Sequence, residues 1–281
     1  MALKLNSTRE AYREFYGKNV EQMPALIADG RVPISAAQLM QKRLNVRNAE
    51  AESKSAWMDN YFDTGDAIAY HPDGRVKVVL DSQTLREMTP ESKRNGGALV
   101  LGEDVYKALQ GIEFKKGKLG NTGNWMSKAD VKAHPVWKAL ARDQALLNDY
   151  ADYIFGEYQA RFAKDTPIND VTAMGVFPSS CQSESPEMRA WLVNGLEARS
   201  FVVDRGNLDY NLGRFVGIAP EAQVAKNLGS AIVVPSRKVL SVEQVLAETA
   251  QTSAYAPDQI KKLQNILDQQ GYTIVQRILS S

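Results

Sequence analysis

The feature that most constrains the fold is a predicted β-hairpin at residues 67–81, AIAYHPDGRVKVVLD. Its HPDG turn places a proline where the turn favours φ of about −65° and a glycine where positive φ is allowed. Val76, Val78 and Leu80 then alternate with the residues between them, with the period of two that a strand requires. Hairpins combined with helices of unequal length do not give the regular strand–helix alternation of a doubly wound parallel sheet. We therefore predict an α+β fold.

The first sixty residues are predicted to be mainly helical. Ser7 and Glu10 have the spacing of a capping box, and the apolar positions of residues 11–16 then lie on one helical face. Ser35 and Gln38 repeat the same spacing ahead of a second helix.

The middle of the chain is predicted to contain one long helix, Val136–Phe162, because its apolar residues recur at intervals of three, four and seven. Gly156 inside it allows a kink or an early stop. Shorter elements are expected before it: a helix at 82–88, a turn, strand and helix at 95–109, and a helical turn capped by Ser127.

The C-terminal part is predicted to begin with a helix at 186–200, with Ser185 as N-cap and Pro186 at the first helical position. Two strands around a polar turn are expected within 200–218. The remaining expected elements are a strand at 230–236, helices at 241–250 and 257–270, and a closing strand at 272–279.

These elements suggest three stretches of chain. Residues 1–163 form a helical N-terminal region with the hairpin and the long helix, 164–185 form a loop or boundary, and 186–281 form a small mixed α/β region. The alternative is one continuous domain. In either arrangement we expect the hairpin and a mixed sheet to pack on the long central helix.

Composition excludes several kinds of site. One cysteine permits neither an intramolecular disulfide nor a cysteine-clustered zinc site, and two histidines do not make a histidine-rich metal site. A formal net charge of +1 argues against coating nucleic acid or a membrane by bulk charge. No run approaches the roughly 20 apolar residues that cross a bilayer. We expect a soluble cytoplasmic protein with no membrane partner, no metal and no cofactor.

The strongest binding signal is a lysine-rich loop. Lysines attract phosphate groups, and exposed aromatic rings stack on bases, so a nucleic acid or another anionic partner is the expected ligand. The glycines of GKLGNTGNW, at 117–125, do not have the order of a phosphate-binding P-loop. The candidate binding residues are Lys115, Lys116, Lys118, Trp125, Lys128 and Lys132.

An alternative function is a cysteine-dependent hydrolase or transferase that uses Cys181. Its thiol would need a histidine, either His71 or His134, to lower its pKa. Cys181 lies four residues before the expected helix start, and no papain-like CGSCW pattern surrounds it. A buried small apolar residue is the structural alternative for this cysteine. A structural or assembly component is the third hypothesis.

Overall fold

The computed structural model describes residues 11–115, 118–181, 183–206 and 208–219. These residues all fall in the first of the two units into which the chain divides, Met1–Lys226. The strands and helices expected between residues 230 and 279 lie outside the described residues.

The described chain is built on a mixed sheet. Its main path follows the order β1-β12-β3-β10-β11-β9-β8. The pairs β12–β3 and β11–β9 are parallel, and the other pairs are antiparallel. The strands on this path are β1 Tyr12–Gly17, β3 Phe62–Tyr70, β8 Trp125–Met126, β9 Met174–Phe177, β10 Glu187–Val193, β11 Val202–Gly206 and β12 Gly213–Ile218. The remaining strands are β2 Val32–Pro33, β4 Val76–Val79, β5 Arg94–Asn95, β6 Ala98–Val100 and β7 Ile112–Phe114.

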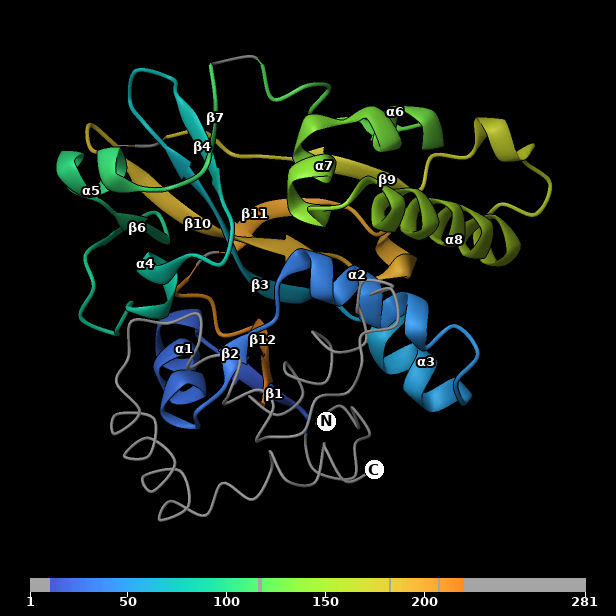
Figure 1. Ribbon diagram of the computed structural model, residues 1–281, viewed down its shortest axis with the longest axis horizontal. Helices are drawn as coiled ribbons and strands as arrows, with labels where there is room; N and C mark the ends of the chain where they lie inside the picture. The colour runs from blue at the N-terminus through green and yellow to red at the C-terminus, as the bar shows by residue number, and fades with distance from the viewer. Residues whose placement is uncertain (1–10, 116–117, 182, 207, 220–281) are drawn as a thin grey trace, which may run out of the picture. The chain divides into compact units, whose positions relative to one another are not determined.

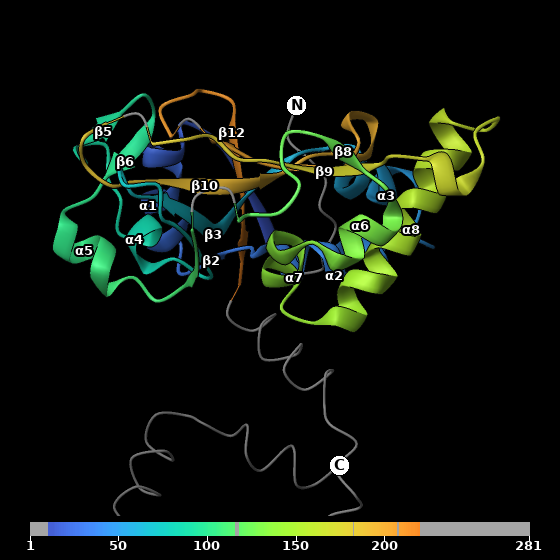
Figure 2. The same cartoon turned by 90° about the horizontal axis from the view of Figure 1, so that it is seen from above.

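Strands from the two predicted regions are interleaved in one sheet. Figure 2 shows β3 and β10 running side by side, and their register joins Tyr70 to Glu187 and Phe62 to Val193. The range 164–185 carries the short helix η1 (Ile168–Asp170) as well as β9. At the edge of the sheet β1 pairs with β12, and the N–H of Ala219 donates to the carbonyl of Ala11 at 3.0 Å.

The helices form two groups, which Figure 1 shows as α1, α4 and α5 at the left and α2, α3, α6, α7 and α8 at the right. Successive residues of β3 point to different groups: Ile68 and Tyr70 join the core under the second group, and Ala67 and Ala69 the core under the first. The helices are α1 Asn19–Ala28, α2 Ala36–Asn45, α3 Ala51–Met58, α4 Gln83–Arg86, α5 Glu103–Ala108, α6 Lys128–Ala133, α7 Pro135–Ala141, α8 Gln144–Phe162 and η2 Leu196–Ala198. The chain is therefore α+β, as predicted.

Several local predictions are confirmed. β3 and β4 form the expected hairpin, with Tyr70 opposite Val76 and Gly74 at φ 92° in the turn. Ser35 caps α2 in a capping box completed by Gln38. The hairpin and the cap could be predicted because each depends on residues within a few positions of one another.

The predicted helix over residues 7–17 is wrong where the chain is described. Residues 12–17 form β1, while residues 1–10 lie outside the described residues. Phe15 is the buried member of this short strand. Six residues are too few to separate the two periods. The pairing partner, β12, begins about two hundred residues later in the sequence.

The long helix Val136–Phe162 is not confirmed, because it breaks at Arg142. This residue adopts φ 63°, in the left-handed region, and ends α7. Its guanidinium contacts Asp66 at 2.8 Å and Asp81 at 2.6 Å, two carboxylates from other parts of the chain. Asp143 then caps α8. These ion pairs, rather than Gly156, explain the break.

The helix predicted after Ser185 is also wrong, because Glu187–Val193 is the central strand β10. The strand lies between β3 and β11, so nearly all its residues are buried and the alternation that marks a one-sided strand is lost. Pro186 directly precedes it, and its carbonyl accepts from the N–H of Leu101 at 2.8 Å. Proline is compatible with the beginning of a strand.

Candidate functional site

A pocket of about 590 Å³ opens where β3, β11 and β12 begin and β10 ends. Its lining comes from one face of the sheet: Leu192 and Val203 line it, whereas their neighbours Val193 and Val202 belong to the core on the other face. A volume of this size falls in the range of small-molecule sites, which is about 300–1,000 Å³.

Aromatic rings form one wall of the pocket. Trp125, Phe177 and Phe201 meet edge to face, with ring centroids 4.9–5.4 Å apart. The guanidinium of Arg199 lies over the Trp125 ring, 4.9 Å from its centroid. Such clusters hold their rings in place because each edge faces the negative face of a neighbour.

Further apolar side chains that line the pocket lie on the connection between β11 and β12. Tyr210 is 56% exposed and Leu212 43% exposed, and Trp125 is 37% exposed. Tyr61 lines the pocket beside them, and its hydroxyl donates to the carbonyl of Leu212 at 2.6 Å. Exposed apolar residues gathered around one concavity are typical of a binding surface.

Two buried polar side chains lie among these apolar walls. Asp63 and Asn19 are each about 1% exposed and line the pocket. One oxygen of Asp63, Oδ2, accepts from the N–H of Arg214 at 2.7 Å. Asp63 Oδ1 and both polar atoms of Asn19 have no hydrogen-bond partner among the described residues. Asn19 lies near enough to Asp63 to favour its charged form, but the two side chains do not reach hydrogen-bonding geometry.

Burial raises the pKa of Asp63 to about 6, even though the N–H of Arg214 favours the carboxylate. The Arg214 guanidinium itself is engaged elsewhere. Its Nε lies 2.9 Å from the Glu14 carboxylate, and its Nη1 donates to Asn60 Oδ1 at 2.7 Å. Burial also raises the pKa of Tyr61 to about 12, so this phenol stays neutral.

Arg43, which is fully buried, supports the segments that carry two of the pocket residues. Its guanidinium donates to the carbonyls of Trp57 and Asn60 and to the hydroxyls of Tyr150 and Ser200, at 2.8–3.1 Å. Asn60 and Ser200 directly precede Tyr61 and Phe201, which line the pocket. Arg43 therefore fixes the backbone from which two walls extend.

The predicted lysine-rich site is only partly assembled. Lys115 and Lys118 are exposed, and Lys116 lies outside the described residues. Lys128 and Lys132 are both paired with Asp152 of α8, at 2.9 and 2.8 Å. The single Asp152 carboxylate thus offsets one of these two positive charges, which weakens the case for a nucleic acid partner. Trp125, the one aromatic residue of the predicted set, belongs to the pocket instead.

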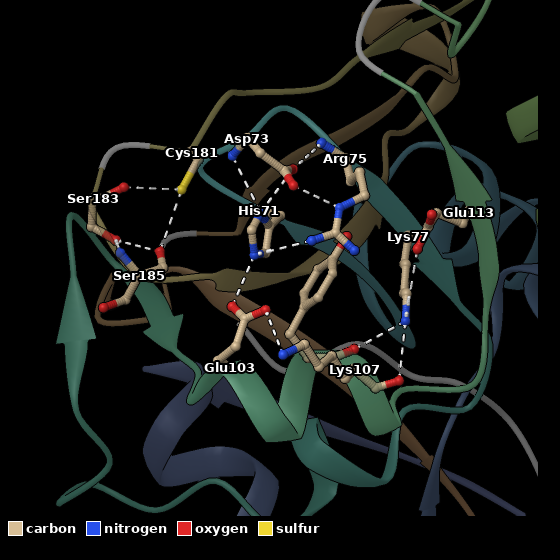
Figure 3. Close-up of polar contacts among 11 residues, drawn as sticks. His71, Asp73, Arg75, Lys77, Glu103, Lys107, Glu113, Cys181, Ser183 and Ser185 are labelled. Carbon is tan, nitrogen blue, oxygen red and sulfur yellow. Dashed lines mark hydrogen bonds and ion pairs between the residues drawn. The ribbon is translucent and has the colours of Figure 1, made fainter.

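Cys181 is half-buried and its thiol donates to the carbonyls of Ser183 and Ser185, at 3.3 and 3.4 Å. Figure 3 shows these contacts beside those of His71, which lead to Asp73, Arg75 and Glu103. The side chain of His71, in the hairpin turn, is 13% exposed and lies 2.7 Å from Asp73 and 2.9 Å from Glu103.

His134 is a structural residue of the α7 start. Its Nδ1 accepts from the N–H of Val136 at 3.2 Å, so Nε2 carries the proton and donates to the carbonyl of Asn121 at 3.1 Å. Burial lowers its pKa and favours this neutral form. The contacts described for Cys181 include neither this histidine nor His71.

Of the pocket residues, sequence reasoning found only Trp125. The others come from segments between residues 19 and 213, which only the folded sheet brings together. One signal was available: FDTGDAIAY places two aspartates, Asp63 and Asp66, in one strand. A carboxylate in a buried strand needs compensating partners, which marks both residues for attention.

The described residues hold no group of three or more histidine, cysteine, aspartate or glutamate side chains that would bind a metal ion. No helix among them is long and apolar enough to cross a membrane.

The chain matches no family model and no curated protein. It is similar to a solved structure from work on the accommodation of massive sequence variation in Nanoarchaeota by the C-type lectin fold. The two share 14% identity with a TM-score of 0.55, over 76% of this chain and 100% of that one. At this identity the likeness extends to the fold and not to the ligand: the chain has a fold like that of C-type lectins.

Proposed function

We propose that this protein is a binding protein whose ligand occupies the pocket lined by Trp125, Phe201 and Tyr210. The observation that carries the proposal is the exposure of large apolar side chains around a concavity that also holds unpartnered, buried polar atoms. Apolar walls with a few fixed polar groups are the usual composition of a ligand site.

The other hypotheses have weaker support. Two of the predicted phosphate-binding lysines are paired with Asp152, and Cys181 donates to backbone carbonyls. A cytoplasmic location, expected from composition, is part of the proposal. We propose no catalytic step.

The solved structure with the similar fold is described as accommodating massive sequence variation. We extend this idea to the pocket rim as part of the proposal. Tyr210 and Leu212 are mostly outside the core, so replacing either with alanine is expected to change the free energy of unfolding by about 0.5 kcal/mol or less. Binding would then be set by side chains on which folding does not depend.

The test uses Trp125 as the reporter, because Trp57, Trp137 and Trp191 are fully buried. Titration with 2-phenylethanol is expected to change the fluorescence and to protect the protein from acrylamide quenching. Tyr210→Ala should weaken this binding. The matched control is Phe162→Ala, which removes a ring that is 48% exposed on α8 outside the pocket. Equal loss in both variants, or no change on titration, would contradict the proposal.

A further inference from the structure

Asn194 gives the pocket a polar side chain that a ligand can reach. It directly follows the last residue of β10 and lines the pocket. It is half-buried, and its backbone N–H donates to the carbonyl of Phe201 at 2.9 Å. Within the part of the chain that the structure describes, its carboxamide forms no hydrogen bond with another residue. Both the donor and the acceptor of this side chain are therefore available to a ligand.

Strand geometry directs the Asn194 side chain toward the pocket. Leu192 lines the pocket, whereas Val193 belongs to the core on the other face of the sheet. Since successive residues of a strand point to opposite faces, Asn194 lies on the pocket face. The β10–β11 register pairs Val193 with Val202, and the hydrogen bond from Asn194 to Phe201 continues it by one residue. The carboxamide of Asn194 thus lies next to the Phe201 ring of the aromatic wall.

Among the described lining residues, no charged group faces the ligand. Asp63 is the only carboxylate that lines the pocket, but it is about 1% exposed, and a backbone N–H occupies one of its two buried oxygens. Arg199 lies over the Trp125 ring without lining the pocket, and its Nε donates to the hydroxyl of Tyr158. A charged ligand would lose its hydration here without gaining a counter-charge, so the pocket favours an uncharged one.

The chemistry of Asn194 narrows the ligand further. A carboxamide holds an acceptor oxygen and a donor N–H side by side in one plane. Its complement is a second primary or cyclic amide, which returns a donor to the oxygen and an acceptor to the N–H. The neighbouring rings of Phe201 and Trp125, whose centroids lie 5.4 Å apart, offer an apolar surface for an aromatic body.

Resting on the proposed function, we propose that the ligand is a small, uncharged aromatic carboxamide. Its amide group pairs with the carboxamide of Asn194, and its ring packs against Phe201 and Trp125. The polar pairing sets the orientation of the ligand, while the apolar contacts supply most of its buried area.

The experiment compares four probes that share a phenyl ring, at pH 7.5: 2-phenylacetamide, N,N-dimethyl-2-phenylacetamide, 2-phenylethanol and phenylacetate. Dissociation constants are measured by calorimetry and by Trp125 fluorescence. We expect 2-phenylacetamide to bind about three- to tenfold more tightly than the alcohol, since one further neutral hydrogen bond gives roughly that factor. The dimethyl amide has no N–H donor and should lose this advantage. Phenylacetate, which brings an unpaired charge, should bind most weakly.

The variant Asn194→Leu keeps a side chain of similar size and removes both polar groups. It should abolish the preference for 2-phenylacetamide over 2-phenylethanol. The matched control is Asn148→Leu, at a half-buried position of α8 outside the pocket, which should leave all four affinities unchanged. If Asn194→Leu does not fold, the comparison of 2-phenylacetamide with its dimethyl derivative tests the same pairing in the unmodified protein.

The outcomes separate this inference from the proposed function. Equal affinities for 2-phenylacetamide and 2-phenylethanol would overturn the inference and leave the proposed function standing. Tightest binding of phenylacetate would also overturn it and would assign the ligand's charge to Arg199. If none of the four probes binds, both fail. If N-acetylphenylalaninamide binds and 2-phenylacetamide does not, the carboxamide belongs to a peptide segment of a protein partner, and the small-molecule assignment is wrong.

Discussion

Replacing Arg43 tests whether a buried cation without a carboxylate partner stabilises this fold. The side chain is fully buried, and its partners in the described chain are two carbonyls and two hydroxyls. The hydroxyls of Tyr150 and Ser200 also bond to each other at 2.8 Å, so they keep a partner when the guanidinium is removed. The carbonyls of Trp57 and Asn60 lose their donor.

The magnitude follows from those two carbonyls. Each buried acceptor left without a donor costs about 1–3 kcal/mol, or about 2–6 kcal/mol for both. Removing the buried charge also removes its desolvation penalty, which offsets part of this loss of stability. For Arg43→Met, which also fills the space of the stem, we therefore expect a loss of about 2–4 kcal/mol in the free energy of unfolding.

The assay is urea unfolding followed by tryptophan fluorescence, with the midpoint and the slope compared between the two proteins. Leu44→Met, at a half-buried neighbouring position on the same helix, controls for inserting methionine into α2. A variant at Arg43 that is as stable as the original protein, or more stable, would show that the buried guanidinium does not stabilise the fold. Buried ion pairs replaced by apolar residues have given that result in other proteins.

Three further outcomes are expected. Arg142→Ala should lower stability by about 1–3 kcal/mol, because it leaves the buried Asp66 without its cation, and urea unfolding measures this. The variant His134→Asn keeps a neutral N-cap residue at the start of α7 but removes the imidazole that titrates. Burial lowers the His134 pKa in the folded state, so the unmodified protein should lose stability as pH falls below about 6.5, and the variant should lose less. Gly213→Ala should destabilise the fold and weaken probe binding, since a Cβ there would collide with Asn19 Oδ1; calorimetry of both properties checks this.

The parts of the fold that could be predicted depend on local chemistry. The hairpin turn and the Ser35 cap are each specified within about five residues. The failures involve distant partners. Arg142 breaks a helix because Asp66 and Asp81 lie across the fold, and residues 12–17 form a strand because β12 offers a free edge. Neither partner is visible from the local pattern.

The candidate site was harder to predict for the same reason. Lysines and a lone cysteine attract notice in a sequence, but Asp152 pairs with two of the lysines. The aromatic wall forms where β8, β9 and the start of β11 lie next to one another. Of these strands, β9 and β11 pair in parallel although they are about 26 residues apart in the sequence. Two pocket residues carried a local signal: Trp125, an aromatic residue in the lysine-rich loop, and Asp63, a carboxylate in the strand FDTGDAIAY.

The hydrogen bond between Ala219 and Ala11 means that the chain enters and leaves the described fold at the same point. A fold whose ends are adjacent can be inserted into a surface loop of another protein without separating the two ends of that loop. The same adjacency permits circular permutation, with 11 and 219 joined by a short linker and new ends opened in the exposed turn at 72–73. Such a permuted chain would carry the pocket intact, since no pocket residue lies near the new ends in sequence.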